Sequence, residues 1–331
     1  MLVDIANEQF NNRNDVGIIV INNNVDLSVK NRICNGVKLF ELNRSRSSKS
    51  IVPVIKLGIL LRIKFKADII HVHDPEIGKL IRILCRTPMV LTVHNTNMDT
   101  GPMLIYSRIF AISEAVKHDI GLRGILNCKV IYNGVLTQNI KKKDSFTVPD
   151  IYKIILVKRL DHKAKGQDLI IRALHLLMTK KGISNIKLYL AGDGISKDYI
   201  QKLITDLNMG EYVTLLGNKS REWVYENLHS YDLVVHPSRM EGFGLTVAEA
   251  MAAKVPVISS NIEGPAEILE YGKYGIMFEN NNYEDLSIQI EKAIKLYENG
   301  DIIKLIESAY NHCLANFNIE RTANEYCESY F

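Results

Sequence analysis

The chain has 331 residues, 47% of them hydrophobic, which is enough for two domains that each bury a core. Residues 1–146 carry 21 Lys and Arg against 12 Asp and Glu, whereas residues 147–331 carry 20 against 25, and the formal net charge is +4. A surplus this small argues against a nucleic-acid partner, whereas the basic first half favours an anionic partner such as a membrane surface.

The cysteines and the N-terminus suggest a compartment. Five cysteines stand far apart without metal-ligand spacing, which is typical of reduced thiols in a cytoplasm. The sequence shows neither a signal peptide nor a run of about 18 uncharged apolar residues that could span a membrane. We therefore expect a cytoplasmic protein, with at most a peripheral contact to the cytoplasmic face of a membrane.

Helix and strand patterns alternate through the first half. Residues 2–10 have helical spacing, 16–21 form an apolar strand-like run, and 53–66 form a basic apolar helix behind a proline. That helix could dock on a membrane or pack on a sheet, and its composition favours neither. The next expected elements are a strand (69–73), a helix (77–86), two strands (89–93 and 109–112), a helix (114–120) and a strand (129–132). This alternation predicts a parallel α/β sheet.

Residues 141–150 are charged, lack periodicity and contain a proline, so they predict a linker. The alternation then restarts, with strands at 152–157, 186–191, 212–216, 232–236, 255–259 and 274–278 and helices at 167–180, 196–207, 220–229, 245–253 and 264–270. From residue 283 onward only helices are expected, the last at about 319–331. We therefore expect two doubly wound domains, 1–146 and 147–318, with the last helix packing back on the first.

The most informative stretch is 236–267, in which Glu241 and Glu249 bracket a Gly-Phe-Gly turn. A strand that ends in glycines and opens a helix presents backbone N–H groups and the positive end of the helix dipole, which suits a phosphate. A carboxylate beside it can accept hydrogen bonds from sugar hydroxyls. For Glu249, a helix-dipole contribution of about 0.3–1 kcal/mol explains its position equally well.

Arg159 and Lys165 flank a loop, RLDHKAKG, that follows the first strand of the second domain. An Arg and a Lys near a helix N-terminus can neutralise the charge that builds on a diphosphate leaving group. Cations in a surface loop are otherwise simply solvated. The run 191–194, AGDG, is only a fragment of a dinucleotide-binding pattern and predicts a tight turn.

His71, His73, Asp74 and His94 lie at the ends of two expected strands of the first domain. They allow a metal site, although the spacing of zinc ligands is absent, and buried structural histidines are the alternative. No Asp-x-Asp pair is present, so we expect protein cations rather than a bound metal to balance the phosphate charge.

Together these motifs resemble the retaining glycosyltransferases of family 4, also called group 1 glycosyltransferases. The residues that carry the resemblance are DIIHVHDP (68–75), TVHN (92–95), AISEAVKHDI (111–120), VIYNGV (130–135), RLDHKAKG (159–166), LAGDG (190–194), PSRMEGFGLTVAEAMAAKVPVISS (237–260) and GPAEIL (264–269). The resemblance implies the α/β fold GT-B, in which two Rossmann-like domains face each other across a cleft. The N-terminal domain would bind the acceptor and the C-terminal domain the nucleotide-sugar donor.

The resemblance also implies residue roles. It assigns donor binding to Arg159, Lys165, Gly242, Phe243, Gly244, Leu245 and Glu249, and catalysis to Glu241 and His94. The two cations and the backbone N–H groups of Gly244 and Leu245 would hold the diphosphate, and Glu249 the ribose. Glu241 would bind sugar hydroxyls near the anomeric centre, and His94 would reach the donor sugar when the cleft closes.

Some positions depart from the family pattern. Lys158 and Lys254 stand where the family usually has glycine, and Glu263 where a glycine is common. The first buried strand and its glycine-rich loop are absent, so either Met1 marks a late start or a truncated copy, or the first domain compensates. Because that strand would be central, its neighbours should lack pairing partners.

The leading hypothesis is a metal-independent, retaining hexosyltransferase. It would move a sugar from a nucleotide-diphosphate sugar to a glycan or lipid-linked acceptor in the synthesis of cell-surface polysaccharide or glycoconjugate. One alternative is an inactive nucleotide-sugar-binding module, because the first strand is missing. Another is a nucleotide-sugar epimerase on the same fold.

Overall fold

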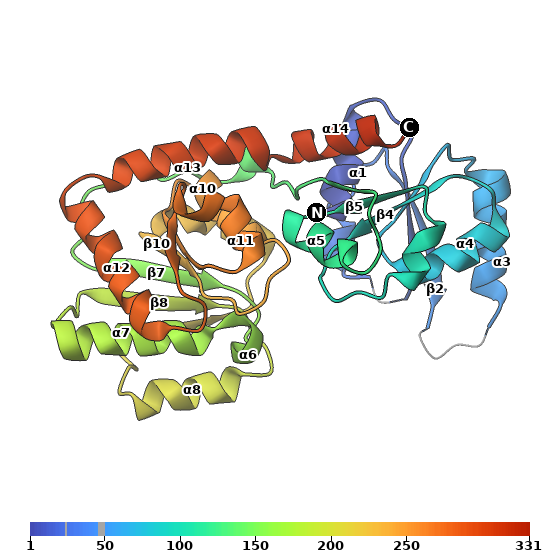
Figure 1. The fold of residues 1–331 in the computed structure, drawn as a ribbon. Coiled ribbons are helices and arrows are strands. Elements are labelled where there is room, and N and C mark those ends of the chain that lie inside the picture. Colours follow the sequence, from blue (N-terminus) through green and yellow to red (C-terminus); the bar gives the residue numbers. More distant parts are fainter. Residues whose placement is uncertain (24, 46–49) are drawn as a thin grey trace. The chain divides into compact units, whose positions relative to one another are not determined.

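The computed structural model describes residues 1–23, 25–45 and 50–331. The chain forms two compact units (Figure 1): unit 1 contains Met1–Gly134 and Asn318–Phe331, and unit 2 contains Val135–Phe317. All of the expected linker, 141–150, is therefore part of unit 2. Its backbone is tied there, because the Lys141 N–H donates to the carbonyl of Tyr225 and the Lys143 N–H to that of Ala253.

Unit 2 contains one parallel sheet. Its strands are β7 (Tyr152–Val157), β8 (Ile186–Ala191), β9 (Val213–Gly217), β10 (Leu233–His236), β11 (Val257–Ser260) and β12 (Ile276–Phe278), in the order β12-β11-β10-β7-β8-β9. From β7, the chain adds β8 and β9 on one side of the sheet. It then returns to the other side of β7 and adds β10, β11 and β12 there. The direction therefore reverses between β7 and β10, and ligands of doubly wound sheets bind at such a switch point. All six strands were predicted, to within two residues.

The helices of unit 2 are α6 (His162–Lys165), α7 (Gln167–Lys181), α8 (Lys197–Asp206), α9 (Arg221–Asn227), α10 (Leu245–Ala252), α11 (Glu263–Ile268), α12 (Tyr283–Glu298) and α13 (Ile302–Asn316). Apolar residues of the strands and helices make one core, including Leu156, Ile170, Leu188 and Ile290, all fully buried. Strands with both faces covered read as continuous apolar runs, which is why these strands were predictable.

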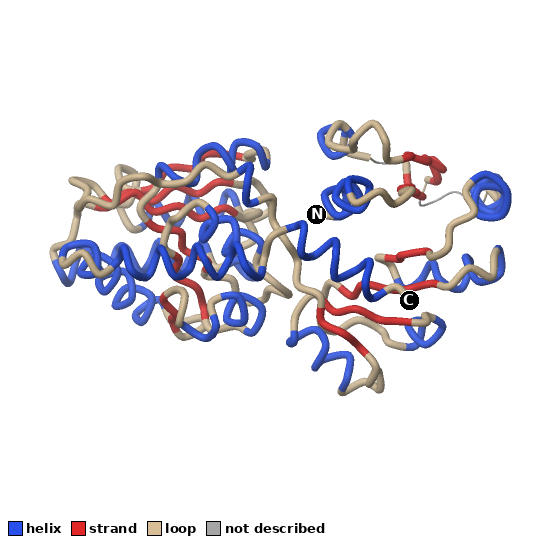
Figure 2. Tube along the Cα trace, turned by 90° about the horizontal axis from the view of Figure 1, so that it is seen from above, coloured by secondary structure: helices blue, strands red, loops and turns tan. Residues whose placement is uncertain are grey.

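The described residues of unit 1 form two sheets. Strands β1 (Gly17–Asn22) and β2 (Lys38–Arg44) form a parallel pair, and β3 (Ile70–Val72), β4 (Met89–Val93), β5 (Arg108–Ala111) and β6 (Cys128–Val130) form a parallel sheet of four in that order. Within the described ranges, no strand joins β1 to β3, and Figure 2 shows the strands of unit 1 in two groups. This split is the consequence expected of a doubly wound domain without a central first strand.

The helices of unit 1 are α1 (Leu2–Asn11), α2 (Leu27–Lys30), α3 (Val52–Ile59), α4 (Gly78–Leu84), α5 (Glu114–Gly121) and α14 (Ile319–Ser329). The helix expected over 53–66 is divided, because α3 continues as a π-helix at Leu60–Lys64. None of the described helices combines the length and the apolar character that crossing a membrane requires.

The last helix, α14, packs within unit 1. The buried residues of α14 recur at helical spacing along one face, and Ile319, Ala323 and Tyr326 are each 0% exposed. The Thr322 hydroxyl donates to the Tyr132 carbonyl at 2.9 Å, and the Tyr326 hydroxyl accepts from Thr92 at 3.1 Å. The C-terminal helix therefore contributes to the core of the unit that contains the N-terminus.

Candidate functional site

The candidate site lies at the switch point of the unit 2 sheet. Lys158 directly follows β7, and Glu241 lies in the loop that leads from β10 to α10. Because neighbouring parallel strands end at the same edge, residues that follow β7 and β10 are brought together although they are far apart in sequence.

The loop after β7 is held tightly against the loop after β10. The Arg239 N–H donates to the Ala164 carbonyl at 2.9 Å, and the Arg239 guanidinium binds both carboxylate oxygens of Asp168 at 2.9 Å. Gly166 has φ +69°, and a Cβ there would lie 2.0 Å from the Pro237 carbonyl oxygen. Only glycine therefore permits this close approach, which fixes the backbone beside Lys165.

The glycines of the LAGDG motif have a packing role. Gly192 and Gly194 have φ of +150° and +158°, and a Cβ on them would lie 1.9 Å from the Lys158 carbonyl oxygen and 2.5 Å from the Leu160 carbonyl oxygen. The predicted tight turn is thus pressed against the loop that carries Lys158.

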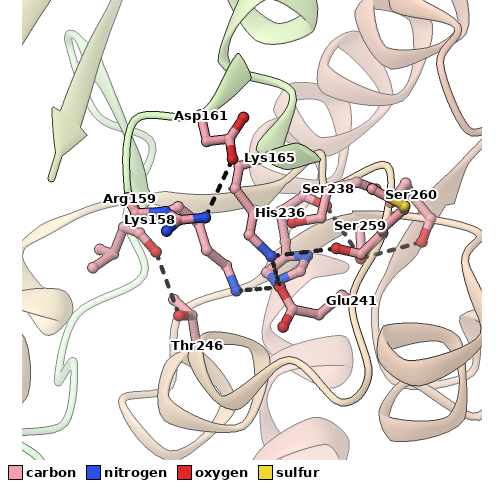
Figure 3. A network of polar contacts seen from close by, with 12 residues as sticks. Lys158, Arg159, Asp161, Lys165, His236, Ser238, Glu241, Thr246, Ser259 and Ser260 are labelled. Carbon is pink, nitrogen blue, oxygen red and sulfur yellow. Dashed lines mark hydrogen bonds and ion pairs between the residues drawn. The ribbon is translucent and has the colours of Figure 1, made fainter. Parts of the chain in front are cut away.

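Glu241 is the centre of a charged cluster (Figure 3). Its Oε2 accepts hydrogen bonds from Lys158 Nζ at 2.7 Å and from Lys165 Nζ at 3.0 Å, and His236 Nε2 lies 3.8 Å away. The Glu241 side chain is only 18% exposed. Two lysines from the β7 loop thus converge on one carboxylate oxygen from the β10 loop.

The cluster keeps Glu241 ionised. Burial by itself would raise the pKa of this carboxyl, but the positive charge of Lys158, helped by its hydrogen bond and by Lys165, lowers the pKa to about 2. Burial lowers the pKa of Lys158, and the Glu241 carboxylate opposes that shift. Burial also holds the pKa of His236 well below its usual value, so its ring is neutral at pH 7.

Some buried polar atoms at the end of β10 and in the loop after it lack partners. Both ring nitrogens of His236 and the hydroxyl oxygen of Ser238 have no hydrogen-bond partner within the described parts of the chain. Buried polar atoms are usually paired, and a water or a ligand commonly supplies the missing bond. His236 and Ser238 are therefore candidate contacts that the sequence motifs did not single out.

The Gly-Phe-Gly turn starts α10. Gly244 is the N-cap residue with φ +106°, and no side chain caps the helix. A Cβ on Gly264 would lie 2.8 Å from the backbone of Gly242 and Phe243, so the turn packs closely on α11. The Phe243 side chain is buried, with its ring edge-on to Phe317. Phe243 can therefore serve the site only through its backbone, as can the two glycines.

Glu249 lies on α10, half-buried. Burial raises the pKa of Tyr225 to about 12, and the negative charge of Glu249 adds to this shift. The same charge also acts to raise the pKa of Lys158. The charge of Glu249 therefore acts on Lys158, a member of the Glu241 cluster.

Arg159 is placed differently from Lys165. Its side chain is 71% exposed, and its guanidinium lies 3.2 Å from the Asp161 carboxylate. The second cation bound to Glu241 is Lys158, which the sequence marked only as a departure from the family pattern. That departure was the signal that could have identified it.

His94 lies in unit 1, after β4. Its Nε2 is 2.9 Å from His73 Nδ1, while the ring nitrogens of His71 are 2.9 Å from the Tyr330 hydroxyl and 2.7 Å from the Thr92 hydroxyl. Burial lowers the pKa of all three histidines. The ring nitrogens of His71 are thus already occupied, which favours the structural interpretation of these histidines over a metal site.

The chain matches two family descriptions in sequence. Residues 1–139 match Glycosyltransferase Family 4, and residues 137–311 match Glycosyl transferases group 1. An uncharacterized glycosyltransferase of Methanocaldococcus jannaschii is 30% identical over 276 residues, which cover 72% of this chain and 68% of that protein. The poly(ribitol-phosphate) alpha-N-acetylglucosaminyltransferase of Staphylococcus aureus is 31% identical over 195 residues, which cover 58% of this chain and 37% of that enzyme.

Solved structures show the same fold. HepE of Anabaena, crystallised with UDP and glucose, has a TM-score of 0.80 at 20% identity, covering 99% of this chain and 94% of that one. A glycosyltransferase from Rickettsia africae has a TM-score of 0.81 at 18% identity, covering 99% of this chain and 92% of that one. With its two Rossmann-like domains of the GT-B fold and the sequence matches above, the chain belongs to the group 1 glycosyl transferases.

Proposed function

We propose that this protein is a retaining hexosyltransferase that moves a sugar from a nucleotide-diphosphate sugar to a glycan or lipid-linked acceptor. The observation that carries the proposal is the pairing of Lys158 and Lys165 with Glu241 at the switch point of the unit 2 sheet. The cluster joins an anionic acceptor of hydrogen bonds to cations that can stabilise a leaving phosphate.

The diphosphate would be bound by cations and backbone amides. Lys165 would turn from Glu241 to the phosphate, and Lys158 would lie close by. The side chain of Arg159 is exposed, so it could rotate toward the phosphate. The N–H groups of Gly244 and Leu245 at the uncapped start of α10 would complete the cradle. These cations offset the phosphate charge, so we propose that the reaction needs no metal ion.

The sugar and the ribose would be bound by the two glutamates. Glu241, ionised at neutral pH, accepts hydrogen bonds from sugar hydroxyls, and Glu249 accepts them from the ribose. His94 remains a predicted contact to the donor sugar. The acceptor oxygen would bond to the anomeric carbon on the face that the diphosphate leaves, and its proton would pass to the leaving phosphate, so the configuration is retained.

The relatives support a sugar nucleotide as donor. HepE was solved with UDP and with UDP-glucose, and the S. aureus relative is named for transfer of N-acetylglucosamine to poly(ribitol-phosphate). We propose an acceptor of the same broad kind, a cell-surface polysaccharide or glycoconjugate precursor, and a cytoplasmic site of action, which agrees with the five free cysteines.

A panel of UDP-, GDP- and ADP-sugars tests the proposal. We expect release of the nucleoside diphosphate from one donor when an acceptor extract is added, undiminished by EDTA, and an NMR spectrum of the product with the anomeric configuration of the donor. Calorimetric binding of a donor without turnover would instead indicate the binding module. An altered nucleotide sugar formed without acceptor would indicate the epimerase.

A further inference from the structure

Unit 1 carries an exposed surface that is both apolar and basic, on α3, the π-helix that follows it, and α4. Its apolar members are Ile51, Val52, Ile55, Ile59, Ile63 and Ile83, all exposed. Its basic members are Lys56, Arg62, Lys64, Lys66, Arg82 and Arg86, also exposed. We call these twelve residues the α3–α4 surface, and Figure 1 shows the two helices next to each other.

The exposure follows from helical geometry. Pro53, Leu57 and Leu60 are buried and face the core, whereas Ile55, Ile59 and Ile63 recur every four residues on the opposite face. Ile63 is 68% exposed and Ile83 is 76% exposed. A row of exposed isoleucines is uncommon on a water-facing helix, and a larger apolar patch usually marks an interaction site.

A basic cavity opens beside this row. It has a volume of about 620 Å³ and its lining includes Arg62, Lys66, Arg82, Ile83 and Arg86. The Arg62 guanidinium is held in place because it donates to the carbonyls of Leu84 and Ile83 at the end of α4. In the described parts of the chain, no carboxylate forms an ion pair with the four cations of this lining. The cavity is therefore a site of uncompensated positive charge next to apolar side chains.

We propose that the α3–α4 surface docks on an anionic membrane, with the isoleucines in the headgroup layer and the cavity around a lipid phosphate. Amphipathic helices with cations beside large apolar residues bind membranes by adding apolar burial to electrostatic attraction. A second copy of the chain fits the surface less well, because a two-fold contact would bring the same six cations together. This role does not depend on donor binding, which lies in unit 2.

Co-sedimentation with lipid vesicles, without any donor or acceptor, tests the docking. We expect the protein to bind vesicles containing about one-third phosphatidylglycerol, and to bind pure phosphatidylcholine at least about tenfold more weakly, since each cation near an anionic surface contributes roughly a fivefold factor. Binding should fall steeply as salt is raised toward about 1 M, because the electrostatic attraction is screened. Equal binding to both vesicle types, or none to either, would overturn the proposal.

Two double variants separate the cavity from the apolar row. Arg82→Ala with Arg86→Ala should weaken binding about 25-fold, at a factor of about five for each cation. Ile59→Ser with Ile63→Ser should also weaken it at least about tenfold, because both side chains lose their apolar insertion. All four residues are exposed, so circular dichroism should show an unchanged fold.

Matched controls change the same kinds of side chain elsewhere. Leu122→Ser with Leu126→Ser removes two exposed leucines of unit 1, and Lys187→Ala with Lys202→Ala removes two exposed lysines of unit 2. We expect both controls to bind vesicles as the parent does. If the controls lose as much vesicle binding as the test variants, the assignment is contradicted. It is also contradicted if the protein dimerises with rising concentration and the isoleucine variant abolishes that dimer.

Discussion

Lys158 Nζ donates a hydrogen bond to Glu241 Oε2 at 2.7 Å, within an ion pair between the end of β7 and the loop after β10. The pair joins two loops that are 83 positions apart in sequence. Because both side chains are largely removed from water, each depends on the other for compensation of its charge. Lys158 therefore determines how the Glu241 carboxylate is held.

Replacing Lys158 by methionine should damage both the site and the fold. Without its nearest counter-charge, Glu241 is held by Lys165 alone, and Lys165 is then less available to a phosphate. We expect kcat/KM for transfer to fall by roughly 10²–10³, the scale for loss of one preorganised charge-stabilising group. Unfolding in urea should show a loss of stability of roughly 3 kcal/mol or less, because one lysine remains.

Lys143→Met is the matched control for that variant. Lys143 forms a similarly buried ion pair with Asp232 at 2.6 Å, away from the Glu241 cluster. We expect a comparable loss of stability but a kcat/KM of the folded enzyme close to that of the parent. If both variants lose activity in proportion to their stability, Lys158 has only a structural role.

The resemblance named Arg159 for the donor diphosphate and did not predict the contact between Lys158 and Glu241, which depends on strand geometry. Successive side chains of an extended segment point to opposite sides, so only one of two adjacent cations after β7 can face Glu241. Lys158 faces the cluster, whereas Arg159 is exposed beside Asp161. The motif RLDHKAKG begins at Arg159, and it contains neither this direction nor the distance from either cation to Glu241.

The strands that are buried on both faces were predictable from the sequence, and the partly exposed elements were less so. The expected bounds of β7 and β8 agree with the structure, because both are continuous apolar runs. Strand β2 (Lys38–Arg44) was not predicted, since among the described residues it pairs with β1 alone and its exposed positions carry polar residues. The break between α3 and the π-helix was also not predicted, because both have the same apolar and basic composition.

The two glutamates should fail in different ways when replaced. Glu241→Ala should abolish transfer but leave nucleotide affinity nearly unchanged, because its proposed contacts are to the sugar. Glu249→Ala should weaken nucleotide binding, by roughly 1.5–3 kcal/mol for a lost hydrogen bond to a charged group. Calorimetry with the nucleoside diphosphate and single-turnover assays with the donor measure the two effects, and negligible changes in both variants would remove the assignment.

Gly166→Ala should separate the two loops of the site. The new Cβ would lie 2.0 Å from the Pro237 carbonyl oxygen, so the loop carrying Lys165 must move. The control is Gly182→Ala, which has a similar φ of +68° but no atom within 4 Å of the added Cβ. We expect the control to lose only the roughly 1–2 kcal/mol of a left-handed residue, and Gly166→Ala to lose more, together with donor affinity. Equal losses of stability and unchanged affinity would show that the contact with Pro237 is unimportant.

The low pKa of Glu241 predicts a pH-dependent contribution to stability. Because the folded-state pKa is about 2 and the usual value is 4.5, the ionised carboxylate stabilises the folded protein fully above about pH 4.5. That stabilisation is lost progressively as the pH falls toward 2, where the folded protein also takes up the proton. The shift corresponds to a contribution on the order of 3 kcal/mol at neutral pH.

Glu241→Gln isolates this contribution, because glutamine has nearly the same shape but no charge. In urea unfolding at pH 7 the variant should be less stable than the parent, and the difference should narrow steadily between about pH 4.5 and pH 2. Asp285→Asn is a useful control, since this half-buried carboxylate in the first turn of α12 accepts hydrogen bonds from the Glu279 N–H and the Gln289 side chain and takes no part in the lysine cluster. A Glu241→Gln difference that stays constant across the same pH range would mean that Lys158 and Lys165 do not hold Glu241 in its ionised form.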